Sequence, residues 1–140
     1  MIAALRLLNA LCLIAVMAIG GYYAFLEPPF LSYGNLPFPV LTPRVKDGNV
    51  VLLDVSRCNS DTKIRIYVVA HSLVGETMTI LLPALPTSIR PGCSQSFSAI
   101  NVVPLNTPPG TYHIEGYAEV QGTLRTSSIA WRSESFEVVR

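Results

Sequence analysis

The chain has 140 residues, which leaves room for one domain of ordinary size. Half of the residues are hydrophobic and 14% are charged, against about 25% in an average soluble domain. The composition excludes a disordered chain, a collagen and a coiled coil. The net charge is +1, and the lack of a basic field argues against a nucleic-acid partner.

The apolar excess lies in one segment near the amino terminus. Leu7–Leu26 contains no charged residue, and as a helix these twenty residues would span about 30 Å, the thickness of a bilayer's hydrocarbon core. Tyr22, Tyr23 and Phe25 stand at the far end of the run, where an aromatic belt is expected. The sequence therefore predicts a transmembrane helix over residues 1–26, with the lipid bilayer as a partner.

The flanking charges predict how this helix is oriented. Arg6 precedes the run and Glu27 follows it, so the positive-inside rule places the amino terminus in the cytoplasm and residues 27–140 on the periplasmic or other extracytoplasmic side. The alternative is a cleaved signal peptide, because Ala18–Gly20 has small residues at the spacing of a cleavage site. The apolar run continues beyond that site, which favours an uncleaved signal-anchor.

Residues 27–48 form a proline-rich and unusually apolar segment. It holds five of the 11 prolines, which fix φ and remove hydrogen-bond donors, so an extended, non-helical spacer is expected. Flexible linkers are rich in glycine, serine or charge, whereas this one is rich in large apolar side chains. We therefore expect the spacer to be ordered against the domain's own surface, lipid headgroups or another subunit, with Phe30, Leu36 and Phe38 as candidate contacts with a protein partner.

Beyond Gly48 the apolar pattern has a period of two, which is typical of half-buried strands. The apolar phase shifts between Trp131 and Phe136, which indicates a bulge between the last two strands. The predicted strands are Val50–Val55, Lys63–His71, Thr77–Leu82, Ser94–Val103, Tyr112–Val120, Thr123–Trp131 and Glu134–Val139.

Seven short strands separated by turns predict an all-β fold, an antiparallel β-sandwich of immunoglobulin type over residues 49–140. The segment Pro108–Tyr112, which leads into a long alternating strand, resembles the approach to the penultimate strand of immunoglobulin-like domains. That resemblance implies that Tyr112 forms a tyrosine corner. Trp131 is a core candidate outside the tryptophan position of antibody domains, so the resemblance is to the broad superfold, which hosts many functions.

Of the three cysteines, Cys12 lies in the apolar run, and Cys58 and Cys93 lie beside turns of the β-domain. In an oxidising compartment the latter two can pair, and the alternative is two unrelated reduced thiols. We predict the disulfide, which on the chain-entropy model stabilises the domain by about 3–4 kcal/mol.

No catalytic or metal-binding motif is apparent. His71 and His113 are expected on the wetter faces of their strands, and no nucleophile elbow or oxyanion motif accompanies His71 and Ser72. Glu115 and Glu119 on one strand would lie about 13 Å apart, too far for a glycosidase pair. There is no tight Cys/His cluster for zinc and no phosphate-binding loop, so we predict a protein that is not an enzyme and that needs no cofactor or metal.

Two functional classes remain. The layout resembles small accessory envelope proteins of Gram-negative bacteria and their phages. This implies a non-catalytic single-pass membrane protein that displays an immunoglobulin-like domain as a structural or accessory subunit of an envelope or phage-related assembly. The alternative is a sensing module that binds a ligand or peptide through its end loops, with the segment Ala84–Gly92, expected to be a long loop, as the contact surface.

Overall fold

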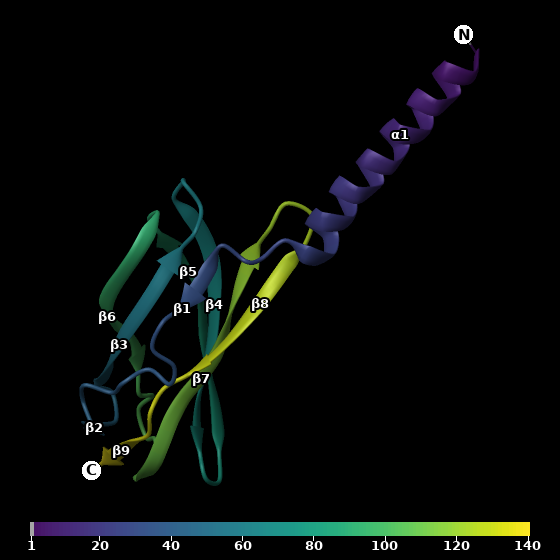
Figure 1. Cartoon of the computed structure of the whole chain (residues 1–140). Coiled ribbons are helices and arrows are strands. Elements are labelled where there is room, and N and C mark those ends of the chain that lie inside the picture. Colours follow the sequence, from purple (N-terminus) through teal and green to yellow (C-terminus); the bar gives the residue numbers. More distant parts are fainter. Residues whose placement is uncertain (1) are drawn as a thin grey trace.

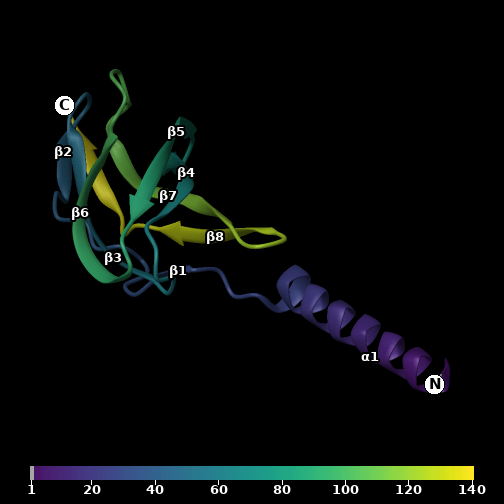
Figure 2. The ribbon, with the colours of Figure 1, turned by 90° about the horizontal axis from the view of Figure 1, so that it is seen from above.

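The computed structural model describes residues 2–140, with side chains described for residues 4–96 and 102–140. Helix α1 (Ile2–Gly21) is prolonged by one π-helical turn, η1 (Tyr22–Leu26). All remaining regular structure is β, which confirms the prediction of a mostly β chain with one apolar helix at the amino terminus. Figures 1 and 2 show α1 projecting away from the β-domain.

The strands of the β-domain form two sheets. The first has the order β1-β3-β6, and the second has the order β2-β9-β7-β4-β5, with β8 also pairing with β7. The strands are β1 (Leu31–Tyr33), β2 (Arg44–Lys46), β3 (Val50–Asn59), β4 (Arg65–Gly75), β5 (Thr79–Ile89), β6 (Gly92–Val102), β7 (Gly110–Gln121), β8 (Thr126–Arg132) and β9 (Phe136–Val139).

Strands β8 and β9 follow one another along the same edge of β7. Strand β8 pairs with Glu115–Gln121 and β9 pairs with Gly110–Tyr112. The interruption falls at residues 133–135, where the shift in apolar phase predicts it. Buried Ser133 spans the break, because its hydroxyl oxygen accepts a hydrogen bond from the Ile114 N–H at 2.9 Å and its own N–H donates to the Ile114 carbonyl at 2.7 Å.

The segment predicted as a spacer contributes one strand to each sheet. Strand β1 pairs antiparallel with β3 and strand β2 pairs parallel with β9. Phe30 and Phe38 are 9% and 2% exposed, whereas Leu36 is 48% exposed. The first two are therefore packed inside their own domain and do not face a partner, because burying a large apolar side chain contributes about 1.5–3 kcal/mol without one.

The core between the sheets consists of two clusters. The larger contains Phe38 from the segment before β2, Leu53 from β3 and Trp131 from β8. The Phe38 ring lies 5.2 Å from that of Tyr33 and 5.4 Å from that of Trp131, measured between centroids. The smaller cluster lies nearer to α1 and contains Phe30, Leu31, Tyr67, Ile89, Ala118 and Val120.

The segment Ala84–Gly92 is not the long loop that its prolines indicated. Strand β5 continues to Ile89, and its register with β4 places Pro86 opposite Val68. This strand lies at the end of the second sheet and pairs only with β4. A proline lacks an N–H but is tolerated on such an edge strand, because one side of the strand makes no ladder hydrogen bonds.

Candidate functional site

The helical segment contacts the β-domain at the hairpin between β7 and β8. The Glu27 carboxylate accepts two hydrogen bonds from Thr123, one from the backbone N–H at 2.8 Å and one from the hydroxyl at 2.7 Å. The Arg125 guanidinium donates to the carbonyl oxygens of Phe25 at 2.9 Å and of Glu27 at 2.8 Å. We call this set of contacts, made by Phe25, Glu27, Thr123 and Arg125, the junction.

The junction satisfies groups that a helix end leaves without partners. The last carbonyls of a helix have no intrahelical donor and carry partial negative charge, so a cation there is favourable. Arg125 supplies that cation, and the Glu27 N–H continues the π-helical turn by donating to the Tyr22 carbonyl at 2.9 Å. The direction in which the helix leaves the domain is thereby set by side chains of the β7–β8 hairpin.

The Glu27 carboxylate has a lowered pKa and lies close to the backbone of Gly122. The hydrogen bond from the Thr123 hydroxyl, followed by that from the Thr123 N–H and the charge of Arg125, holds the pKa of Glu27 below its ordinary value. Gly122 permits this approach, since a Cβ at that position would lie 2.8 Å from the Glu27 Oε2 atom and 3.0 Å from the Arg125 carbonyl oxygen. A side chain at position 122 would therefore crowd the carboxylate that Thr123 holds, which favours glycine there.

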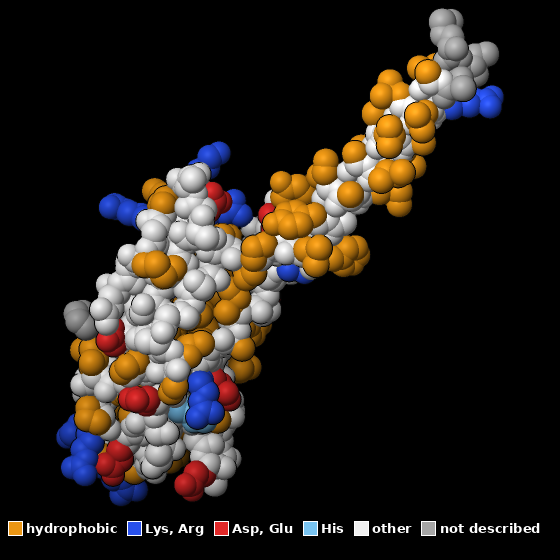
Figure 3. All heavy atoms as spheres, in the orientation of Figure 1, with side chains coloured by type: hydrophobic (Ala, Val, Ile, Leu, Met, Phe, Trp, Pro, Cys, Tyr) orange, Lys and Arg blue, Asp and Glu red, His pale blue; other side chains and the backbone are white. Residues whose placement is uncertain are grey.

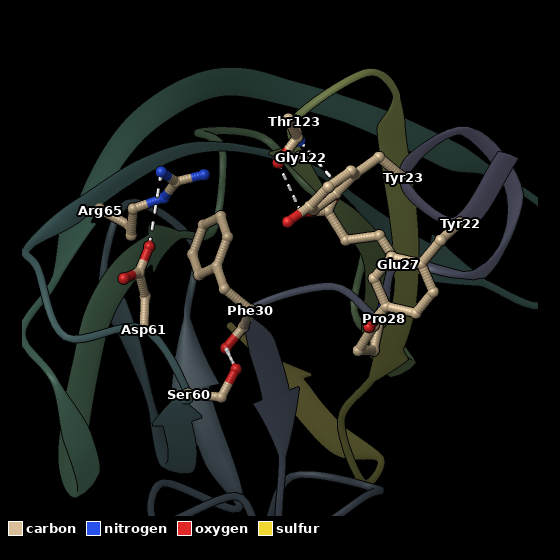
Figure 4. Close-up of a pocket in the computed structure, with 10 residues that line it drawn as sticks. All are labelled: Tyr22, Tyr23, Glu27, Pro28, Phe30, Ser60, Asp61, Arg65, Gly122 and Thr123. Atoms are coloured by element: carbon tan, nitrogen blue, oxygen red, sulfur yellow. Dashed lines mark hydrogen bonds and ion pairs between the residues drawn. The ribbon is translucent and has the colours of Figure 1, made fainter. Parts of the chain in front are cut away.

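An open cavity of about 370 Å³ lies beside the junction. Figure 4 shows the aromatic residues Tyr22 and Tyr23 on one side of it and Arg65 with Asp61 on the other. The Arg65 guanidinium lies 4.7 Å from the centroid of the Phe30 ring, 3.5 Å from the Asp61 carboxylate, and donates to the Gln121 carbonyl at 2.6 Å. Of the charged side chains that line the cavity, Asp61 and Arg65 therefore bind one another, and Glu27 is bound by Thr123. They form no nucleophile–base pair.

A second depression, of about 470 Å³, opens on the second sheet. Small residues line it at Ala70, Gly116 and Ala130, beside the larger Leu81 and Tyr117. Leu81 is 85% exposed and Tyr117 is 44% exposed. His71, Ser72 and Glu115 also line it, so its wall is mostly apolar with a few polar groups, which is typical of a surface that binds a ligand or a partner.

The predicted disulfide is confirmed. Cys58 of β3 and Cys93 of β6 are directly opposite one another in the first sheet, with their Cα atoms 4.0 Å apart, and they are bonded. Cys12 is free and exposed on α1. The Tyr112 hydroxyl at the start of β7 donates to the Pro108 carbonyl at 2.9 Å.

His71, Ser72 and Glu115 all line the depression on the second sheet, but among the described side chains no hydrogen bond joins these three side chains to one another. His71 is buried on the core face, with its ring centroid 6.4 Å from that of Trp131, and not on the wetter face as predicted. The prediction was wrong because β4 is apolar on both faces, so alternation alone does not tell which face is buried: outward Ile66 is 71% exposed and inward Tyr67 is 3% exposed. Ser72 follows His71 directly, and its hydroxyl donates to the Glu115 carbonyl oxygen at 3.4 Å.

One histidine lies at the limit of ion-pair distance from a carboxylate. The His113 Nε2 atom is 3.9 Å from the Glu115 carboxylate. Within residues 2–140, no group of three His, Cys, Asp or Glu side chains is arranged to hold a metal ion. The junction residues Glu27, Thr123 and Arg125 were missed from the sequence, where nothing connects positions that lie almost a hundred residues apart.

Comparison with known proteins assigns no family. No family model matches the chain, and no curated protein matches it in sequence. One similar solved structure is the alkylpurine DNA glycosylase of Pseudomonas fluorescens bound to DNA, with 11% identity, a TM-score of 0.43, and a match over 75% of this chain and 31% of that one. Another is a family 123 glycoside hydrolase from Clostridium perfringens, with 15% identity, a TM-score of 0.38, and a match over 78% of this chain and 27% of that one. The chain thus spans about a third of these proteins or less, and likenesses at these TM-scores assign no activity to it.

Proposed function

We propose that the chain is a non-catalytic single-pass membrane protein that displays an immunoglobulin-like domain on the extracytoplasmic side of a membrane. In this proposal α1 and η1 remain on the protein as an uncleaved anchor. The β-domain acts as a structural or accessory interaction subunit of a larger envelope assembly.

The exposed apolar helix carries this proposal. The segment Ala4–Leu26 has a mean hydropathy of 1.9, and none of its most apolar stretch is buried inside the structure. Figure 3 shows hydrophobic side chains all along the visible face of the helix. A helix that is apolar all round needs an apolar environment, and since the β-domain does not provide one, a bilayer is the environment that fits its length.

The anchor needs a test of its own, separate from the junction. Arg125 and Thr123 hold the end of the helical segment against the β-domain through four hydrogen bonds. All the residues in these bonds lie beyond the alternative cleavage site at Ala18–Gly20, so the junction would form with or without α1. An extraction at alkaline pH tests the anchor, because an integral protein stays with the membrane pellet and a peripheral one is released.

Strand order and one tyrosine support the immunoglobulin-like assignment. Strands β1, β3 and β6 correspond in order to A, B and E of such a sandwich, and β4, β7 and β8–β9 correspond to C, F and G. The hydrogen bond from Tyr112 to the backbone of Pro108, just upstream of β7, has the form of a tyrosine corner. The disulfide joins neighbouring strands of one sheet, unlike the bond between the sheets of antibody domains, and it fits an oxidising compartment.

Of the three spacer residues that we predicted as partner contacts, the two phenylalanines are buried and Leu36 is exposed, so we propose a second surface for a partner. The exposed apolar side chains that line the depression on the second sheet offer such a surface, with Leu81 and Tyr117 as its main members. Purification of the tagged full chain from gently solubilised membranes tests this proposal. A stoichiometric protein that is lost with Leu81→Glu and retained with Leu105→Glu, an exposed leucine in the turn before β7, would support an accessory subunit.

The same depression favours the second candidate, a binding or sensing module. Its volume of about 470 Å³ lies within the range of small-ligand sites. The purification distinguishes the two candidates, because a sensing module would retain a small molecule or peptide in place of a stoichiometric protein.

A further inference from the structure

Three turns form the end of the β-domain beside the helix. They are residues 59–65 between β3 and β4, residues 89–93 between β5 and β6, and residues 121–126 between β7 and β8. Their proximity follows from the pairing of Asn59 with Gly92 and of Arg65 with Ile89, and from the hydrogen bond of Arg65 to Gln121. Figure 1 shows α1 leaving the domain at this end. We call these three turns the helix-proximal end.

From this arrangement we infer that the helix-proximal end rests on the headgroup layer of the membrane that the helix spans and prefers anionic phospholipid there. This inference rests on the proposed function, because it requires that the helix is an anchor. It adds a second contact between the protein and the bilayer, made by the β-domain itself.

The charge of the helix-proximal end is complementary to an anionic surface. The three turns contain four basic residues and one acid, and Glu27 at the junction adds a second acid, although residues 27–140 as a whole contain equal numbers of acids and bases. Of the two acids, Asp61 forms an ion pair with Arg65, and the Glu27 carboxylate accepts a hydrogen bond from the Thr123 hydroxyl. Lys63 and Arg90 are exposed, and within the described side chains no carboxylate lies within ion-pair distance of either.

The tip of the β7–β8 hairpin adds an apolar contact next to the helix. Leu124 is 61% exposed, and it stands between Thr123 and Arg125, which hold the end of the helical segment. An exposed leucine at this level can enter the boundary between headgroups and acyl chains, as the apolar face of an interfacial helix does. Basic side chains nearby attract anionic lipid within about 10 Å at moderate salt.

Quenching by brominated acyl chains tests this placement on the full chain. Leu124→Trp reports contact with lipid, and the native Trp131 gives a low baseline because it is only 8% exposed in the core. Leu105→Trp is the matched control, since Leu105 is a leucine that is 75% exposed in the turn at the opposite end of the domain. The three proteins are compared in vesicles of brominated phosphatidylcholine, with and without phosphatidylglycerol.

We expect several-fold more quenching of the tryptophan at position 124 than of the one at position 105, with a further increase when phosphatidylglycerol is present. The double substitution Lys63→Gln with Arg90→Gln should abolish that increase, and Lys46→Gln with Arg140→Gln, at the opposite end, should preserve it. Flotation with the vesicles separates the two proposals. A chain that does not float overturns the anchor and this inference together, whereas a floating chain whose tryptophans at 124 and 105 are quenched equally overturns this inference alone.

Discussion

Thr123 donates two hydrogen bonds to Glu27 across 96 positions of sequence, from its backbone N–H at 2.8 Å and from its hydroxyl at 2.7 Å. The two residues belong to the segment that leaves the helix and to the tip of the β7–β8 hairpin. Their contact attaches the segment that follows the helix to the β-domain. Arg125 from the same hairpin also binds the last carbonyls of the helical segment.

Replacing Glu27 with leucine should release this contact. The Thr123 amide loses its acceptor, so its hydrogen exchange should accelerate, and Glu119→Leu should leave that exchange unchanged because Glu119 is an exposed strand residue away from the junction. Hydrogen exchange of the hairpin in detergent micelles measures the effect. Equal protection of Thr123 in both variants would show that the carboxylate does not hold the hairpin.

The junction should also respond to acid. Since the pKa of Glu27 is lowered in the folded protein, its contribution is complete above the ordinary glutamate pKa of about 4.3 and is lost as the pH falls through the lowered value. At neutral pH we therefore expect no dependence on pH.

Removing the disulfide should destabilise the β-domain. The bond closes a loop with a sequence separation of 35, and the double substitution Cys58→Ser with Cys93→Ser should cost about 3–4 kcal/mol of unfolding free energy. Cys12→Ser is the control and should have no effect. Denaturant unfolding in detergent measures the difference, and thiol labelling after denaturation should find one reactive cysteine without reductant and three with it.

Two apolar residues of the predicted spacer should differ sharply in their importance. Phe38→Ala removes a side chain that is 2% exposed and packed against Trp131, so it should cost about 3–5 kcal/mol. Leu36→Ala truncates a side chain that is 48% exposed, and its effect should stay within about 0.5 kcal/mol. Similar losses in the two variants, measured by thermal unfolding, would contradict the assignment of Phe38 to the core.

The local pattern of the sequence predicted where the strands lie better than it predicted which strands pair with one another. The period of two located four of the seven strands after Gly48, because burial on one face imposes alternation. Less regular apolar runs located the other three, and the phase shift near Ser133 located the break between β8 and β9. The proline-rich segment was expected to be extended, but only the fold shows that it supplies β1 and β2. A second expectation, a long loop over Ala84–Gly92, was wrong because strand β5 continues to Ile89, and an edge strand tolerates the prolines there.

The sites depended on contacts that no local pattern records. The disulfide could be predicted because two cysteines of a domain that is predicted to be exported have few other roles. The junction could not, since Glu27 and Arg125 read as ordinary surface charges until the hairpin brings them together. The buried face of β4 was similarly undecided, because Ile66 and Val68 are as apolar as the side chains that face the core.

His71 should make the stability of the β-domain depend on pH. Burial lowers the pKa of His71 below its ordinary value of 6.5, so the unfolded chain binds more protons than the folded protein as the pH falls below 6.5. The free energy of unfolding should therefore be highest above pH 6.5 and decline toward the lowered pKa. His71→Gln should flatten this decline and His113→Gln should not, which denaturant titrations at pH 7.5 and 5.5 would measure.

The central claim is that α1 remains on the protein as its membrane anchor, and the intact mass of the chain extracted from membranes tests this most directly. Cleavage after Gly20 would leave the junction contacts in place but would remove the helix, so the mass distinguishes the two forms directly. We predict a mass of 15.2 kDa, that of the full chain, in the fraction that resists alkaline extraction. A mass that corresponds to a chain starting at Gly21 would contradict the account.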